Sequence, residues 1–251
     1  HCPICEDERQ YVGWQGQQWT TLGELEEEGR QNELHDEETG LVSIGTVPSL
    51  AIGQRALLLQ TPAGNVLWDC IGYLNEETVA AVRRLGGLAA IGISHPHFYG
   101  SVVEWSEAFG GVPIYIHQND QEWVVRKSRA LTLWDTEHLE ILPGVTLVRL
   151  GGHFDGAAVL HWTAGAGGQG ALLSGDTIQV VMDRRYVSFM YSYPNLIPLP
   201  ETAVRHIVDA VRPYPFERLY GAWKGRVVFL EGHDSVERSA ERYIRALRSS
   251  R

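Results

Sequence analysis

AAIGISHPHFYG, residues Ala89–Gly100, is the stretch that decides the fold of this chain. An apolar run with strand character ends there in two histidines spaced His-x-His. Residues i and i+2 of a strand project from the same face, so His95 and His97 are predicted to leave one strand end side by side. Neutral imidazole is a good ligand for zinc and iron. The spacing indicates half of a transition-metal site, and the alternative is a pair of surface histidines in a loop.

Two further apolar runs end in side chains of the metal-ligand type. His153 lies in the turn Gly-Gly-His-Phe directly after the strand-like segment Val145–Leu150. Asp176 follows the apolar run that begins at Ala171 and ends in Ser-Gly. Three separate strands are therefore predicted to deliver a ligand at their ends, and this favours the metal site over surface histidines.

In order and spacing, these turns resemble the metallo-β-lactamase fold superfamily. Its motifs are a strand followed by HxHxDH, then a Gly-His turn, a Gly-Asp turn and a last Gly-His. The likeness covers Leu41–Val228, which is most of the chain. It implies an α/β fold, a four-layer αββα sandwich, in residues 41–251. Residues 1–40 are expected to form a separate N-terminal CxxC segment and acidic arm.

The sequence departs from the family pattern at the second metal position. Tyr99 and Gly100 stand where the family has the aspartate and histidine that complete HxHxDH. Gly221-Ala222-Trp223 stands where the family has its last histidine, and His233 is the one alternative for that ligand.

The ligands that remain imply one metal instead of two. The resemblance assigns it to the three-histidine position, together with the aspartate that bridges two metals in the family; these residues are His95, His97, His153 and Asp176. Zinc is the expected ion, and iron is the alternative.

This site predicts a metal-dependent hydrolase of unidentified substrate. A metal held by three neutral histidines keeps its charge, leaves a position open for water and lowers the pKa of that water from about 15.7 towards 7. The hydroxide attacks a carbonyl or phosphoryl centre, Asp176 binds the metal or takes the proton, and Tyr99 donates to the developing oxyanion. Two alternatives stay open: a mononuclear non-haem iron oxygenase using His95, His153 and Asp176, and a non-catalytic or partner-binding protein with an eroded site.

A second metal site is suggested by Cys2 and Cys5 in HCPICEDERQ. One CxxC is half of a structural zinc site or a redox pair, and the alternative is two ordinary thiols. A zinc site would also need His1, His35 or another distant group. The third cysteine, Cys70, reads as a small buried apolar residue. An odd number of cysteines favours a reducing interior, so a cytoplasmic location is expected.

Composition limits the class of partner. The 251 residues are 44% hydrophobic with a net charge of −10, which suits one large α/β domain and disfavours nucleic acid or anionic membrane. No run of 18 apolar residues or secretory signal occurs. Eight carboxylates and one arginine in Gly23–Gly40 predict a solvated, loosely ordered arm. The aromatic and proline-rich Asp183–Pro200 is expected to wall a pocket for a small molecule with an apolar or aromatic part.

Three helices have clear sequence signals. Asn75 is predicted to cap a helix that ends at Gly86-Gly87. A second helix is expected over Asn119–Lys127. Asp234 is expected to cap the last helix, which runs to about Leu247 with arginines on one side and an apolar stripe on the other.

Overall fold

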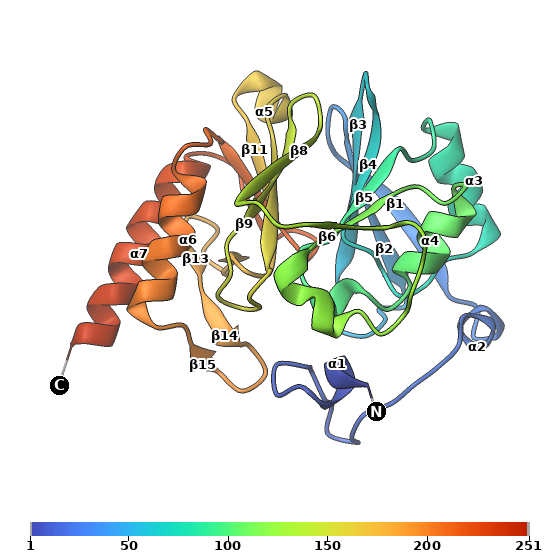
Figure 1. The fold of residues 1–251 in the computed structure, drawn as a ribbon, viewed down its shortest axis with the longest axis horizontal. Coiled ribbons are helices and arrows are strands. Elements are labelled where there is room, and N and C mark those ends of the chain that lie inside the picture. The colour runs from blue at the N-terminus through green and yellow to red at the C-terminus, as the bar shows by residue number, and fades with distance from the viewer. Residues whose placement is uncertain (1, 250–251) are drawn as a thin grey trace.

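The computed structural model describes residues 2–249 and places two β-sheets face to face (Figure 1). The first sheet has seven strands in the order β1-β2-β3-β4-β5-β6-β7. These are β1 (Gln31–Glu38), β2 (Leu41–Val47), β3 (Arg55–Thr61), β4 (Gly64–Trp68), β5 (Ala90–Gly92), β6 (Ile114–His117) and β7 (Leu131–Trp134). Strands β1 to β4 are antiparallel neighbours, whereas β4 to β7 run parallel.

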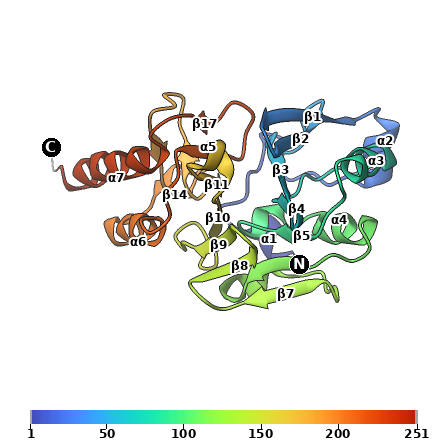
Figure 2. The same cartoon turned by 90° about the horizontal axis from the view of Figure 1, so that it is seen from above.

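The second sheet has six strands in the order β17-β16-β11-β10-β9-β8. These are β8 (His138–Leu142), β9 (Val145–Arg149), β10 (Ala158–Trp162), β11 (Ala171–Gly175), β16 (Arg218–Gly221) and β17 (Val227–Val228). Helices α6 (Glu201–Val211) and α7 (Gly232–Arg248) cover its outer face, and α3 (Glu76–Arg84) and α4 (Val102–Ala108) cover the outer face of the first sheet (Figure 1, Figure 2). The expected four-layer αββα sandwich is confirmed.

Short elements decorate the edges of this sandwich. They are the helices α1 (Pro3–Glu6), α2 (Leu22–Glu27) and α5 (Gly165–Gly168), the 3-10 helices η1 (Pro96–Phe98) and η2 (Gln118–Trp123), and the strand pairs β12 (Gln179–Val180) with β13 (Val187–Ser188) and β14 (Met190–Ser192) with β15 (Ile197–Pro198). Within residues 2–249, no helix combines the length and the apolar character needed to cross a bilayer.

Alternating side chains of the central strands fill two cores at once. In β3, Leu57 and Leu59 pack between the sheets, whereas Ala56 and Leu58 pack under α3 and α4. A strand buried on both faces reads as a continuous apolar run, and β3 to β5 show that pattern in sequence.

The acidic segment was expected to be a loosely ordered arm, and this is wrong for residues 31–38. They form β1, which pairs along its whole length with β2, so the boundary expected between residues 40 and 41 falls inside a hairpin. Two of its carboxylates form ion pairs with arginines of other strands: Glu37 lies 2.6 Å from Nη1 of Arg55 on β3, and Glu38 lies 2.8 Å from Nη1 of Arg218 on β16 of the second sheet. Composition alone does not reveal such long-range pairing, because a carboxylate is costly to bury only while it is unpaired.

The helix expected over Asn119–Lys127 is a shorter 3-10 segment, η2. Asp120 leaves helical geometry within it, and its Oδ1 accepts a 2.7 Å hydrogen bond from the backbone N–H of Gly156. This tie to another loop overrides the local helix signal.

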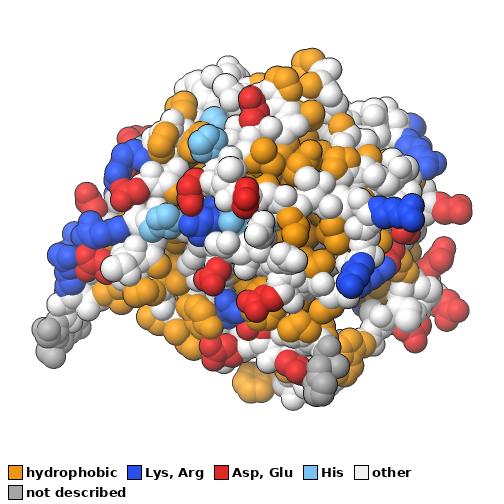
Figure 3. Space-filling view, viewed as in Figure 1, with side chains coloured by type: hydrophobic (Ala, Val, Ile, Leu, Met, Phe, Trp, Pro, Cys, Tyr) orange, Lys and Arg blue, Asp and Glu red, His pale blue; other side chains and the backbone are white. Residues whose placement is uncertain are grey.

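The predicted cap of α3 is confirmed, but that of α7 is wrong. Asn75 Oδ1 accepts a 3.0 Å hydrogen bond from the Thr78 N–H at the start of α3. Helix α7 begins at Gly232, with Glu231 as its N-cap residue, so Asp234 lies in the first turn. On the face shown in Figure 3, basic side chains lie among acidic ones; Arg238 of α7, for example, lies 3.1 Å from Glu231.

Candidate metal centre

Three turns at one edge of the sandwich bring together the four residues expected to bind metal. One ligand atom from each of His95, His97, His153 and Asp176 lies within 4.8 Å of every other, and among residues 2–249 this is the one such group of histidine, cysteine or acidic side chains. His95, His153 and Asp176 are buried, and His97 is half-buried. The sequence-based grouping of these side chains is therefore confirmed in space.

The local structure that presents the histidine pair differs from the expected strand end. Strand β5 stops at Gly92, His95 is an extended residue with φ −169°, and His97 lies inside the 3-10 helix η1. Their rings meet edge to face with centroids 5.0 Å apart. The two side chains converge because a tight turn, and not the pleat of a strand, brings them together.

The spacing of the ligand atoms fits a tetrahedral ion. His95 Nε2 lies 3.2 Å from His97 Nδ1 and 3.2 Å from Asp176 Oδ1. His153 Nε2 lies 3.9 Å from the same Oδ1. Ligands about 2.1 Å from a zinc ion are about 3.4 Å apart in a tetrahedron, so these separations leave room for one ion among the four groups.

The hydrogen bonding around these atoms also fits an ion. His153 Nε2 and Asp176 Oδ1 are buried without a hydrogen-bond partner, which is costly for polar atoms unless a metal or water satisfies them. Burial holds the pKa of His95 well below its usual range and lowers that of His97 to about 3, so both rings are neutral at physiological pH. Neutral imidazole is the form that binds metal.

Two hydrogen bonds fix which ring nitrogen faces the centre. His153 Nδ1 lies 2.7 Å from the carbonyl oxygen of Tyr191, to which it donates. His95 Nδ1 lies 2.9 Å from Ser94 Oγ, which in turn donates to Asp69 Oδ2 at 3.0 Å. Both arrangements leave a lone pair on Nε2, and such supporting hydrogen bonds orient metal-binding histidines.

Sequence reasoning missed Asp69 as a supporting residue. Its Oδ1 accepts a 2.7 Å bond from the Ser94 backbone N–H, and burial raises the pKa of Asp69 to about 8. Gly175, with φ +55°, passes so close that a Cβ there would lie 2.7 Å from Ser94 Oγ. The signal that could have identified Asp69 is the one that identified Asp176: a carboxylate at the end of an apolar strand.

The residues that stand in the sequence where the family has its second set of metal ligands do not form a second metal site in the described part of the chain. Tyr99 is buried with the side chains under α4, and it is not among the residues that line the cavity at the centre. Ala222 is part of the same core, and Trp223 donates from Nε1 to the Ile52 carbonyl at 2.8 Å. His233 does not replace the last ligand, because its ring faces the carbonyl of Arg212 instead.

Cys2 and Cys5 lie close together, because Cys2 is the N-cap residue of α1 and Cys5 lies within that helix. The Cys5 N–H donates to Cys2 Sγ at 3.4 Å, and both side chains are partly buried. No third ligand joins them within residues 2–249, where His35 lies on β1; His1 lies outside the described residues.

A cavity of about 550 Å³ opens onto the metal centre. The N-terminal segment and the loop before β3 form one part of its lining, and residues at the metal centre form another. The lining residues are Arg9, Gln10, Tyr11, Ser49, Ala51, Ile52, Gly53, Gln54, His97, Phe98, His153, Asp176, Gln179, Tyr193, Pro194 and Trp223. The wall expected from Asp183–Pro200 is thus represented by two residues, and Tyr193 Oη donates to the Asp176 carbonyl at 2.7 Å. The N-terminal wall was not expected.

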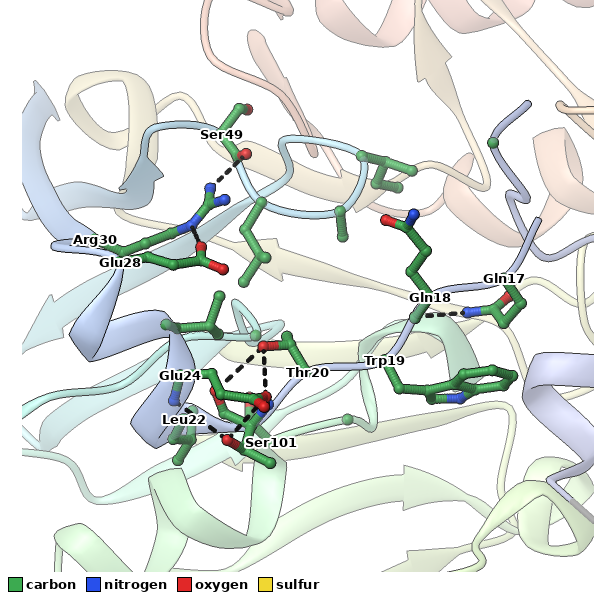
Figure 4. A pocket seen from close by; sticks show the side chains of 18 of the residues that line it. Gln17, Gln18, Trp19, Thr20, Leu22, Glu24, Glu28, Arg30, Ser49 and Ser101 are labelled. Carbon is green, nitrogen blue, oxygen red and sulfur yellow. Dashed lines mark hydrogen bonds and ion pairs between the residues drawn. The ribbon is translucent and has the colours of Figure 1, made fainter. Parts of the chain in front are cut away.

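A larger hollow of about 1350 Å³ adjoins this cavity (Figure 4). The two share Gln10, Tyr11, Ser49, Ala51 and Ile52. Figure 4 shows that its sides come from the N-terminal segment, with Trp19 and Glu24, and from the loop at Ser49, whose carbonyl accepts from Arg30 Nη1 at 2.9 Å. The space next to the metal centre therefore extends along the N-terminal segment.

Comparison with known proteins identifies one related sequence and several solved structures with a similar fold. No family model matches the chain. YmaE of Bacillus subtilis (strain 168), an uncharacterized protein, is 54% identical over 249 residues, which are 99% of this chain and 90% of YmaE.

The solved structure of VMB-1 has a similar fold, with a TM-score of 0.64 and 11% identity over 86% of this chain and 98% of that one. The DIM-1 metallo-β-lactamase has a TM-score of 0.62 and 10% identity, over 84% of this chain and 98% of its own. The metallo-β-lactamase FIM-1 of Pseudomonas aeruginosa, in its mono-zinc form, has a TM-score of 0.61 and 12% identity, over 87% of this chain and 97% of its own. At these identities the likeness concerns the fold alone. The chain therefore has the metallo-β-lactamase fold, and it belongs to the same family as YmaE.

Proposed function

We propose that this chain is a metal-dependent hydrolase with a single ion, zinc, held by His95, His97, His153 and Asp176. The observation that carries the proposal is the set of four ligand-type atoms at tetrahedral spacing, two of which are buried without a hydrogen-bond partner. The mono-zinc form of FIM-1 supports the idea that one ion can occupy this fold. Iron remains the alternative ion.

When bound, zinc supplies Lewis acidity that makes hydroxide available from water near neutral pH. The residues of this chain do the rest. Tyr191 and Ser94 hold the rings of His153 and His95 in one tautomer. The Asp176 carboxylate completes the ligand set or accepts the proton of the attacking water, and Tyr193 holds the Asp176 backbone in place.

The cavity supports a substrate class. Its lining includes aromatic or apolar side chains at Tyr11, Phe98, Tyr193 and Trp223. Arg9 is the one lysine or arginine among the described lining residues, and its charge is paired with Asp7. We infer a small molecule with an apolar or aromatic part that carries a hydrolysable carbonyl or phosphoryl group.

We also infer a reducing, cytoplasmic environment, because an odd number of cysteines suits free thiols better than a disulfide framework.

The decisive experiment measures metal and activity on the same protein. Elemental analysis of chain purified without added metal should give one first-row ion at this centre. The same preparation is then tested on ester, thioester, lactone, lactam and phosphodiester compounds. Two ions at the histidine group would contradict the one-metal site, and a full site that leaves every compound intact would contradict hydrolysis and favour a non-catalytic metal-binding protein.

A further inference from the structure

We propose that Arg9, in the N-terminal segment, is a positioning residue for the metal centre, acting through His153. This inference rests on the proposed metal site. Arg9 Nη1 donates a 2.8 Å hydrogen bond to the His153 carbonyl, which lies 144 residues away in the sequence. The contact reaches the backbone of a ligand residue from a segment that precedes both sheets.

The guanidinium of Arg9 is held in one orientation. Its Nε and Nη2 bond to the two carboxylate oxygens of Asp7 at 2.7 and 2.8 Å, and both side chains are about nine-tenths buried. Three aromatic rings surround the cation: its Cζ lies 3.8 Å from the ring centre of Phe154, 5.1 Å from that of Tyr191 and 5.2 Å from that of Trp123. A planar cation in such a cage is bonded and stacked at the same time.

Two members of this cage also control His153. Phe154 follows His153 in the chain, and Tyr191 supplies the carbonyl that accepts from His153 Nδ1. Arg9 therefore contacts the backbone of the ligand, its neighbour in sequence and the residue that fixes its tautomer.

The segment around Arg9 is tied down on the same side. Tyr191 Oη donates to Glu8 Oε1 at 2.8 Å, and Ser192 Oγ donates to the Glu8 carbonyl at 3.2 Å. Figure 1 shows the N-terminal loop beside the hairpin of β14 and β15 at the lower edge of the molecule. Arg9, Gln10 and Tyr11 then form one wall of the cavity that contains His97 and Asp176. The N-terminal segment thus closes the centre on one side while Arg9 orients a ligand.

The test compares Arg9→Ala with Arg238→Ala in the full chain. Arg238 of α7 is a matched control, because it makes the same kinds of contact away from the centre. Its Nη1 lies 3.1 Å from the Glu231 carboxylate, its Nη2 donates to the Arg185 carbonyl at 3.0 Å, and its Cζ lies 5.8 Å from the ring centre of Tyr186. Zinc affinity, measured by competition with a chelator, should fall by about 10- to 100-fold in Arg9→Ala. It should change less than about twofold in Arg238→Ala.

A second variant and a metal-free measurement keep the test decisive. Arg9→Lys keeps the charge but cannot bond to Asp7 and His153 with one planar group, so it should still lose affinity. In metal-free protein, hydrogen exchange at His153 Nδ1 followed by NMR should be about tenfold faster in Arg9→Lys than in the wild type, and unchanged in Arg238→Ala. Unchanged affinity and exchange in both Arg9 variants would overturn the inference, and so would equal losses in Arg238→Ala.

These readouts separate the inference from the proposed function. A wild-type chain that binds zinc but hydrolyses nothing would contradict the hydrolase, whereas zinc affinity would still decide the role of Arg9. A wild-type chain that binds no first-row metal would contradict both.

Discussion

The two metal positions that the family resemblance implies differ in their surroundings in this chain. The three-histidine position keeps four ligand-type side chains within 4.8 Å of one another, and buried polar atoms there lack hydrogen-bond partners. At the other position, Tyr99 and Ala222 pack into the apolar core under α4. The second position is filled by apolar packing, whereas the first combines unpaired polar atoms with four ligand-type side chains. The contrast teaches that unsatisfied buried atoms within a group of ligand-type side chains, more than fold membership, identify the candidate metal site.

The largest effect should come from breaking the retained position. His153→Ala removes a ligand from a turn outside the three hydrophobic cores, so we expect zinc affinity to fall by more than about 100-fold while the chain stays folded. Elemental analysis and circular dichroism check both parts. His138→Ala, at an exposed site on β8, is the control and should keep its metal. Stoichiometric metal in His153→Ala would show that the ion lies elsewhere.

Activity sharpens the comparison of the two positions. Asp176→Asn should lower the rate of hydrolysis by about 10² to 10⁴, because it removes the carboxylate that binds the ion or takes the proton. Tyr99→Phe should change the rate little, since Tyr99 lies in the core and does not line the cavity. The measurement is the rate of hydrolysis by each variant and the wild type, on any compound of the panel that the wild type hydrolyses. A larger loss in Tyr99→Phe would return the phenol to the catalytic role that the sequence suggested.

The pH dependence of stability should report the buried carboxyl of Asp120, which accepts a hydrogen bond from the Gly156 N–H. Burial raises the pKa of Asp120 to about 7, above its usual 3.8, so between these values the folded chain keeps a proton that the unfolded chain has lost. The stability from this group is present at low pH and is lost as pH rises through that range, by at most about 1.4 kcal/mol per pH unit.

Asp120→Asn should flatten that slope, as measured by urea unfolding of metal-free protein between pH 5 and 8. Asp209→Asn, exposed on α6, should leave the slope as in the wild type. An identical slope in Asp120→Asn would mean that the Asp120 carboxyl is ionised throughout.

The smallest effect is expected from the N-terminal cysteines. If Cys2 and Cys5 hold structural zinc, the double change to serine should lower metal content and melting temperature together, because the binding energy of the metal is then folding energy. Cys70→Ser serves as the control for losing a thiol from the core. Metal content that does not change in the double variant would make Cys2 and Cys5 ordinary thiols.

Long-range contacts account for what sequence reasoning got wrong. Glu37 and Glu38 looked like part of a solvated arm, but arginines from β3 and β16 stabilise them in a sheet. Tyr99 looked like a donor at the centre because of its place in the motif, yet the turn after His97 directs it into the core. The acidic residues were misassigned because their partners lie far away in sequence, whereas the direction of Tyr99 depends on the geometry of a turn.

The sequence by itself predicted the four residues of the candidate metal centre, and its resemblance to a known superfamily predicted the layered fold. Apolar runs ending in His95, His97, His153 and Asp176 are local patterns, and burying a strand on both faces leaves its polar ends at one edge. Only the tertiary structure decided what supports and encloses the centre. Asp69 reaches His95 through Ser94, and Arg9 reaches His153 across 144 residues. Such contacts depend on how distant turns pack together, which no local pattern encodes.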